Sequence, residues 1–355
     1  MSTMRVTAER LTILEHPNAD ALELAQVGLY RAVVAKGAYR TGEFAVYIPE
    51  QSVLPEPLID ELGLTGRLAG SAKNRVRAVR LRGELSQGIV CRPTALKDTD
   101  LERAAADGAD FAERLGIVKW VPPVPVSMSG DVESAPDLLP WTDIENLKRH
   151  PDIFAPGDLV SVTEKIHGSA CCLTYYAATG SAHVTSKGLG ARGLALKESE
   201  ANLYWRAVRG HGLAEVAADL AERLGADRIG IYGEVYGKGV QDLGYGAEAG
   251  TSVPGFAAFD VRADIGGQVR WLDPAGLPTD RLPLVPRLFA GPFDLERVLE
   301  LARGAETVSG RGLHIREGVV VRTAEDKYSP VLGGRAIAKV VSDAYLTRKG
   351  GTEYE

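Results

Sequence analysis

The chain has 355 residues, which is enough for two or three domains with separate hydrophobic cores. Its composition of 45% hydrophobic and 25% charged residues is ordinary for a soluble protein, and a net charge of −6 excludes nucleic-acid binding through overall charge alone. An odd count of three cysteines argues against a disulfide framework, and no signal-like or membrane-spanning apolar run is found, so we expect a soluble cytoplasmic protein.

The first 93 residues are predicted to form a small β-barrel. Short β-type runs such as "YRAVVAKGAY", "EFAVYIPEQSVLP" and "SQGIVC" alternate with Gly, Pro and Asn. "HPNADALELAQV" and "LSQGIV" resemble the oligonucleotide-binding (OB) barrel appended to some tRNA-handling proteins. "KNRVRAVRLR" gives an arginine stripe in an otherwise acidic chain, which we interpret as a nucleic-acid contact, although a charged, solvated edge strand is the alternative. The stripe consists of Arg75, Arg77, Arg80 and Arg82.

The composition changes twice after the barrel. An acidic helical segment, "TDLERAAADGADFAERLG", precedes the Pro- and Ser-rich "VPPVPVSMSGDVESAPDLLP". We therefore expect an OB-like domain with a helical extension over 1–120, a linker over 121–140 and a second domain over 141–355. The expected strands of the second domain lie near 158–165, 173–187, 228–236, 255–262 and 316–322, and its helices near 198–209 and 213–224. This mixture predicts an α+β fold.

Lys165 lies in "VTEKIHGSACC", a strand-like run that ends in His-Gly-Ser. An ordinary lysine has a pKa near 10.4 and is a non-nucleophilic ammonium at neutral pH. Burial or cationic neighbours lower that pKa, so we expect this amine to be held free of its proton. Nucleophilic lysines form Schiff bases with carbonyl compounds or phosphoramidates with nucleotides.

The parts that phosphoramidate chemistry requires follow Lys165 in order. They are carboxylates for a metal ion, cations for phosphate, and an aromatic face for a base. They stand in "VTSKG", "IGIYGEVYG", "PGFAAFDV", "REGVVVR" and "RAIAKVV", and the residues are Lys187, Glu234, Phe256 or Phe259, Glu317 and Lys339.

This ordered set resembles the covalent nucleotidyltransferase superfamily of polynucleotide ligases and mRNA capping enzymes. "KIHG" resembles its lysine motif and "YGEVYG", "FAAFDV", "EGVVVR" and "AIAKVV" resemble the later motifs. The His after the lysine, where most members have Asp, and the preceding "PWTDIENLKRHPDIFAPGD" resemble the RNA-ligase branch, in particular nick-sealing RNA ligases of the Deinococcus type. The resemblance implies an antiparallel-sheet adenylation domain after the barrel, ATP as substrate, Mg²⁺ or Mn²⁺, a nicked RNA-containing duplex as partner, and a monomer.

The resemblance also implies roles for individual residues. Lys165 is implied to be the nucleophile that carries AMP, assisted by Glu317 and Lys339. Phe256 is preferred to Phe259 as the aromatic that stacks on adenine. The implied nucleotide-binding set is Glu164, His167, Gly168, Lys187, Glu234, Phe256, Glu317 and Lys339, and the implied metal-binding pair, acting through water, is Glu234 and Glu317.

Alternative functions remain open on the sequence. A capping-type guanylyltransferase or a DNA ligase would use the same lysine, but both usually carry an OB domain after the fifth motif, and we expect none after Glu355. A non-catalytic RNA-binding protein with a degenerate ligase domain is the third possibility. "GLGARG" matches a dinucleotide-binding fingerprint only by letter, because no βαβ unit follows it. The fifth motif has one lysine, Lys339, where related ligases often have two.

Overall fold

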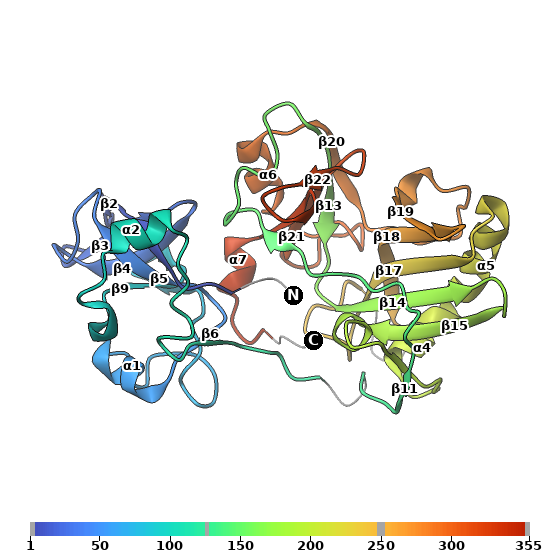
Figure 1. The fold of residues 1–355 in the computed structure, drawn as a ribbon, viewed down its shortest axis with the longest axis horizontal. Helices are drawn as coiled ribbons and strands as arrows, with labels where there is room; N and C mark the ends of the chain where they lie inside the picture. The colour runs from blue at the N-terminus through green and yellow to red at the C-terminus, as the bar shows by residue number, and fades with distance from the viewer. Residues whose placement is uncertain (1–3, 125–127, 247–252, 352–355) are drawn as a thin grey trace. The chain divides into compact units, whose positions relative to one another are not determined.

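The structure of this chain is a computed structural model that describes residues 4–124, 128–246 and 253–351. The chain divides into two compact units. One comprises the N-terminal residues up to Val121 together with Leu346–Arg348, and the other comprises Pro122–Tyr345 and the residues from Lys349. Figure 1 shows the fold of each unit.

The N-terminal unit is built from short strands and three short helical segments. Its elements are β1 (Thr7–Arg10), β2 (Thr12–Glu15), β3 (Leu22–Val27), β4 (Tyr30–Ala35), β5 (Phe44–Ile48), β6 (Ser52–Val53), α1 (Glu56–Glu61), β7 (Val79–Leu81), β8 (Glu84–Ser86), β9 (Ile89–Cys91), η1 (Thr94–Leu96), α2 (Leu101–Ala106) and β10 (Val118–Lys119).

Strand β5 lies between the two cores of this unit. Side chains alternate along a strand, so Ala45 and Tyr47 pack with β3 and β4, whereas Val46 and Ile48 pack with α1 and α2. The strands pair as β1-β5-β9, β2-β3-β4, β7-β8 and β10-β6. The closely spaced β-runs of the sequence predicted a small barrel, and in the structure these strands form several short sheets that share two cores.

The C-terminal unit contains two larger sheets. Its elements are β11 (Val132–Ser134), β12 (Glu145–Asn146), β13 (Leu159–Lys165), β14 (Ser169–Tyr176), β15 (Ser181–Ser186), α3 (Lys187–Gly190), β16 (Leu194–Leu196), α4 (Leu203–Gly210), α5 (Leu213–Leu224), β17 (Arg228–Tyr236), β18 (Gly255–Ile265), β19 (Gln268–Leu272), η2 (Pro274–Gly276), β20 (Arg287–Pro292), α6 (Leu295–Leu301), β21 (Gly318–Thr323), β22 (Tyr328–Ser329), β23 (Gly334–Arg335), β24 (Ile337–Val341) and α7 (Asp343–Leu346).

Seven strands form one sheet in the order β11-β16-β15-β14-β17-β18-β19, and five form the other in the order β12-β24-β21-β13-β20. Helices α4 and α5 bury their apolar faces on the seven-stranded sheet, and α6 packs on the five-stranded sheet. An ion-pair cluster joins the two sheets. Buried Asp260 of β18 accepts from Arg335 at 2.5 Å and lies 3.4 Å from Arg322 of β21.

The structure differs from the sequence interpretation in three places. The segment expected to be a linker contains β11, and Met128, Leu138 and Leu139 in it are buried, so most of it is part of the C-terminal unit. The single strand expected over 173–187 is a hairpin, β14 and β15, with its turn at Ala177–Gly180. Helix α4 begins later than expected because the Asn202 side chain caps it.

Candidate active site

Lys165 is the last residue of β13 and pairs in register with Gly318 of β21. That register places the preceding residue, Glu317, beside the lysine, and Nζ of Lys165 lies 2.7 Å from Oε1 of Glu317. A Cβ at Gly318 would lie 2.0 Å from the carbonyl oxygen of Val340, so only glycine permits β21 to approach β24 this closely. The strand pairing therefore fixes both partners of the ion pair.

The pKa of Lys165 is raised above its ordinary value. Burial favours the neutral amine, but the carboxylates of Glu317 and Glu234, together with the hydrogen bond to Glu317, outweigh burial and stabilise the ammonium. The expectation of an amine held free of its proton is therefore wrong for the protein without ligands. Activation of this lysine requires a change in the charge around it.

Glu234 of β17 faces the same space. Burial raises its pKa to about 7, and the negative charge of Glu317 adds to the effect, while Lys165 and Lys187 oppose it. Gly168 follows the nucleophile motif, and a Cβ there would lie 2.2 Å from the carbonyl oxygen of Val235. The glycine thus lets the turn after Lys165 rest directly on β17.

Two further lysines, Lys339 and Lys187, add their charges to those of Lys165, Glu317 and Glu234. Lys339 of β24 has a pKa lowered to about 8, because burial disfavours its charge and Lys165 repels it. Lys187, at the start of α3, forms an ion pair with Asp143. Sequence reasoning missed Asp143, although its charge acts on both Lys165 and Lys339. It lies in "PWTDIENLKRHPDIFAPGD", before the nucleophile motif, and nothing in its spacing from Lys165 marks it as a charge partner of the lysines.

Glu164 and His167 flank the nucleophile but are held by other parts of the chain. Glu164 is buried, and its Oε2 accepts from the backbone and hydroxyl of Thr307 at 2.9 and 2.6 Å and pairs with Arg316 at 3.3 Å. His167 is buried between Asp242 and Tyr345. The contact of Glu164 with the nucleotide stays a prediction.

The preference for Phe256 as the stacking aromatic is wrong. Phe256 is 2% exposed and lies in the core beneath α4 and α5, where its ring covers Gly233. Phe259 lies three residues further along β18 and therefore on the opposite face, partly buried beside Trp141 at 5.0 Å between ring centroids. Phe259, the alternative that the sequence left open, shares its face with Glu234.

A divalent cation is the group that this set of residues can accommodate. Oε2 of Glu317 is buried and has no hydrogen-bond partner within the described part of the chain, so it has a free lone pair beside the ion pair. Within residues 4–124, 128–246 and 253–351, no three His, Cys, Asp or Glu side chains gather closely enough to enclose a metal. Two carboxylates fit an ion such as Mg²⁺ that retains water and phosphate oxygens as its other ligands.

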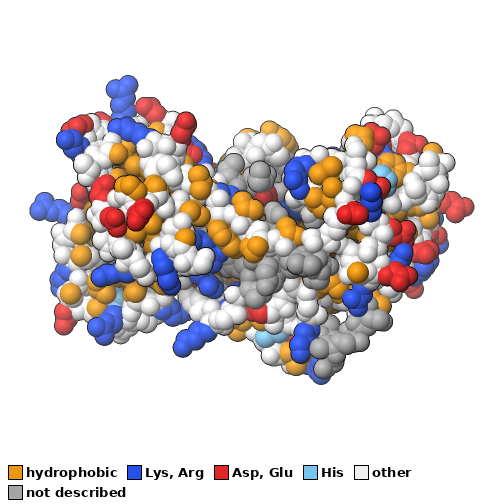
Figure 2. Space-filling view, turned by 90° about the horizontal axis from the view of Figure 1, so that it is seen from below, with side chains coloured by type: hydrophobic (Ala, Val, Ile, Leu, Met, Phe, Trp, Pro, Cys, Tyr) orange, Lys and Arg blue, Asp and Glu red, His pale blue; other side chains and the backbone are white. Residues whose placement is uncertain are grey.

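The arginines of the N-terminal unit do not form one continuous stripe. Arg75 is half-buried with its guanidinium carbon 3.9 Å from the ring centroid of Trp120, whereas Arg80 and Arg82 are exposed on the β7–β8 hairpin. Asn18 donates to the carbonyl of Arg82 at 3.1 Å, which fixes the hairpin turn. Lys and Arg side chains project from this unit, at the left of Figure 2, among acidic ones.

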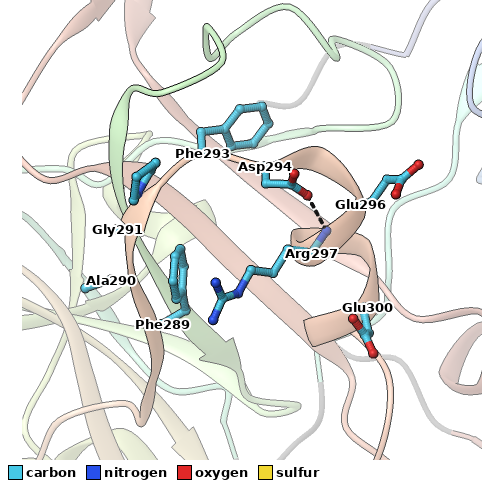
Figure 3. A pocket seen from close by; sticks show the side chains of 9 residues that line it. Phe289, Ala290, Gly291, Phe293, Asp294, Glu296, Arg297 and Glu300 are labelled. Atoms are coloured by element: carbon cyan, nitrogen blue, oxygen red, sulfur yellow. Dashed lines mark hydrogen bonds between the residues drawn. The ribbon is translucent and has the colours of Figure 1, made fainter.

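One surface groove is separate from these residues. It has a volume of about 830 Å³, lies between β20 and α6, and is lined by Phe289, Asp294 and Arg297 among others. Figure 3 shows the Arg297 side chain extended beside the Phe289 ring, with 3.9 Å from the guanidinium carbon to the ring centroid. None of the site residues predicted from the sequence lines this groove.

Residues 158–341, just over half of the chain, match the RNA ligase family, and residues 5–94 match an OB-fold domain. The chain belongs to the RNA ligase family. The predicted α+β fold, with an OB-like barrel before an adenylation-type domain, is confirmed, and so is the prediction of a ligase enzyme. No curated protein matches the ligase in sequence.

Solved structures share the fold of the ligase. The RNA ligase of Naegleria gruberi with PPi is 24% identical, covers 97% of this chain and 98% of that chain, and has a TM-score of 0.75. A mutant of that enzyme with ATP and Mn is 24% identical at 96% and 98% coverage, and another with AMP and Mn is 23% identical at 97% and 98%, both with a TM-score of 0.75. In the described ranges of the ligase, no helix has the length and apolar character to span a bilayer.

Proposed function

We propose that the ligase joins 3′-hydroxyl and 5′-phosphate ends at nicks in RNA-containing duplexes, with ATP as substrate and lysyl-AMP on Lys165 as intermediate. The observation that carries the proposal is the Lys165–Glu317 ion pair, surrounded by the charges of Glu234 and Lys339. Family membership supports the reaction class.

Three displacements at phosphorus follow. Nζ of Lys165 bonds to the α-phosphorus of ATP and pyrophosphate leaves; AMP passes to the 5′-phosphate; the 3′-hydroxyl displaces AMP and closes the phosphodiester. The ammonium must lose its proton first, and Oε1 of Glu317, at 2.7 Å, is the acceptor within hydrogen-bond reach. Lys187 and Lys339 are cations that can stabilise the negative charge on the phosphoryl oxygens.

Separate residues would hold the other parts of the ATP complex. We assign adenine stacking to Phe259, on the basis of its position on the face of β18 shared with Glu234. Glu234 and Glu317 would hold Mg²⁺ or Mn²⁺ through water, and that ion would offset the carboxylate charge that keeps Lys165 protonated. Structures of the Naegleria enzyme with ATP and Mn support this choice of substrate and metal.

The N-terminal unit supplies the contact with the nucleic acid in this proposal. Arg77 is half-buried and Arg80 and Arg82 are exposed, so their charges are available to backbone phosphates. Arg75 is less available because it packs on Trp120. The 2′-hydroxyl at the 3′ end is the group through which such an enzyme distinguishes RNA from DNA.

The test is transfer of label from ATP to the protein. The ligase is incubated with α-labelled ATP or GTP and Mg²⁺ or Mn²⁺, and acid-stable label on the polypeptide is measured. We expect label from ATP that is lost in Lys165→Ala and retained in Lys97→Ala, a matched change at an exposed lysine of the N-terminal unit. Label from GTP alone would indicate a capping-type enzyme, and absence of label from both would indicate a non-catalytic binding protein.

A second assay tests the substrate. A 5′-labelled strand is sealed in a nicked duplex whose 3′-hydroxyl strand ends in either RNA or DNA. We expect joining with the RNA end and a sharp loss with the DNA end. Equal joining of single strands and nicked duplexes would contradict the assignment to nicks.

A further inference from the structure

One short segment after β24, Ser342–Tyr345, contacts both the backbone of Glu317 and the side chain of His167, two residues after Lys165. On one side, the backbone N–H of Ser342 donates to the carbonyl oxygen of Glu317 at 2.8 Å, and the Ser342 hydroxyl donates to the carbonyl oxygen of Arg316 at 2.9 Å. These two bonds hold the backbone from which the Glu317 side chain projects.

On the other side, Tyr345 of α7 contacts the nucleophile motif. Its hydroxyl lies 2.8 Å from Nδ1 of His167, and the two rings meet edge to face at 5.3 Å between centroids. A carboxylate only accepts hydrogen bonds, so Nε2 of His167 carries the hydrogen and donates to Oδ1 of Asp242 at 2.7 Å. In the neutral imidazole Nδ1 then accepts from the Tyr345 hydroxyl.

The remaining contacts show that this arrangement has little freedom. His167 and Tyr345 are buried, and the backbone N–H of His167 donates to the hydroxyl of Tyr245 at 2.7 Å. The backbone N–H of Tyr345 donates to the Ser342 hydroxyl at 3.2 Å, so the residue that contacts His167 is bonded to the residue that contacts Glu317. A small displacement of this segment therefore moves the turn after Lys165 and the backbone of Glu317 together.

We infer that Tyr345, acting through His167, is a positioning residue that fixes Lys165 against Glu317 for attack on the α-phosphorus, and that Asp242 has the same role from the other side of the imidazole. The sequence motifs assign no role to Tyr345 or Asp242. The inference rests on the proposed function for its reaction, but its geometry stands on the contacts within the protein alone.

The test removes one hydroxyl. In Tyr345→Phe the ring and its packing remain, and we expect the single-turnover rate of lysyl-nucleotide formation at saturating ATP to fall about tenfold to hundredfold, as misplacement of a reacting group does. The affinity for ATP and the thermal unfolding midpoint should stay close to those of the wild type. Tyr328→Phe, which removes a hydroxyl from an exposed tyrosine, is the matched control and should leave the rate unchanged.

Two results would overturn the inference. One is a wild-type rate in Tyr345→Phe. The other is a double variant, His167→Ala with Tyr345→Phe, that is slower than His167→Ala by the full factor of the Tyr345→Phe change, because a residue that acts through His167 has no effect once the imidazole is gone.

A measurement without nucleotide separates this inference from the proposed function. Acylation of Lys165 by acetic anhydride, followed by mass spectrometry of the peptide, reports how firmly the amine is held. We expect faster acylation of Lys165 in Tyr345→Phe and in Asp242→Asn than in the wild type. If the wild type forms no lysyl-nucleotide, the proposed function fails and acylation decides the inference: unchanged acylation would refute it.

Discussion

Nζ of Lys165, the last residue of β13, lies 2.7 Å from Oε1 of Glu317, which directly precedes the paired strand β21. The pair keeps the amine protonated in the protein without ligands, since the Glu317 and Glu234 charges outweigh the effect of burial on the Lys165 pKa. The same contact also holds the amine in one direction. Glu317 therefore keeps the Lys165 amine protonated and also fixes its position.

Substitution of Glu317 by Gln separates these two effects. The pKa of Lys165 falls because its nearest carboxylate is lost, so the rate of lysyl-nucleotide formation should begin to rise at lower pH than in the wild type. The maximal rate should fall about 10²- to 10³-fold, since a preorganised polar contact in the site is lost. Single-turnover rates from pH 6 to 10 measure both quantities. An unchanged pH profile would contradict the assigned cause of the raised pKa.

Lys339 should make nucleotide binding sensitive to alkaline pH. Its pKa is lowered to about 8, so the side chain is a cation below that pH and loses its charge above it. We expect the affinity of the free enzyme for a non-hydrolysable ATP analogue to decrease as the pH rises through 8. Lys339→Arg should keep its affinity to higher pH because guanidinium stays charged. Equilibrium binding at pH 7 to 10 checks this, and identical profiles for the two proteins would exclude Lys339 as the group responsible.

Glu234 should weaken the folded protein at neutral and alkaline pH. Its folded pKa of about 7 is above the ordinary carboxyl value, so its contribution to stability is complete at low pH and is lost as the pH rises through 7. Glu234→Gln should therefore raise the free energy of unfolding by about 3 kcal/mol at pH 8 and leave it unchanged at pH 4. Urea unfolding at the two pH values measures the difference. Equal effects at both would show that repacking, not charge, is responsible.

Removal of the Phe256 ring should reduce the stability of the fold, whereas removal of the Phe259 ring should reduce the affinity for ATP. Phe256→Ala empties a filled core position and should cost about 3–5 kcal/mol of unfolding free energy. Phe259→Ala should cost less stability and weaken ATP binding instead, by about 1–3 kcal/mol if the ring stacks on adenine. Thermal unfolding and ATP binding on both variants give the comparison. Unaltered ATP affinity in Phe259→Ala would remove that residue from the nucleotide site.

The exposed hairpin arginines should affect joining and not the lysyl-nucleotide step. In the double variant Arg80→Ala with Arg82→Ala, formation of the lysyl-nucleotide should match the wild type, while nick joining weakens. The slope of the logarithm of nucleic-acid affinity against the logarithm of salt concentration should decrease by the equivalent of about two phosphate contacts. Arg77→Ala should give the same pattern with a smaller change in slope. Filter binding at several salt concentrations measures the slope. Equal loss of lysyl-nucleotide formation and of nick joining would contradict a nucleic-acid role for this hairpin.

Several features of this chain are readable in its sequence because they depend on neighbours along the chain. Short β-runs between Gly and Pro predicted the barrel, and the helix expected near 213–224 is α5, which ends at a left-handed Gly225. The order of the motifs around Lys165, Glu234 and Glu317 was enough to indicate the family. Turn chemistry, strand alternation and motif order are local properties, and a sequence displays them directly.

Other features depended on contacts between distant segments. The register that pairs Ala257 with Glu234 decided that Phe259, not Phe256, shares a face with Glu234. The proton on Lys165 depended on charges from distant parts of the chain, and the partners of His167 came from positions 242 and 345. Strand phase, burial and charge balance arise from packing in three dimensions. The sequence by itself determined which chemical groups the ligase possesses, and the tertiary structure decided which face, which proton and which neighbour each group has.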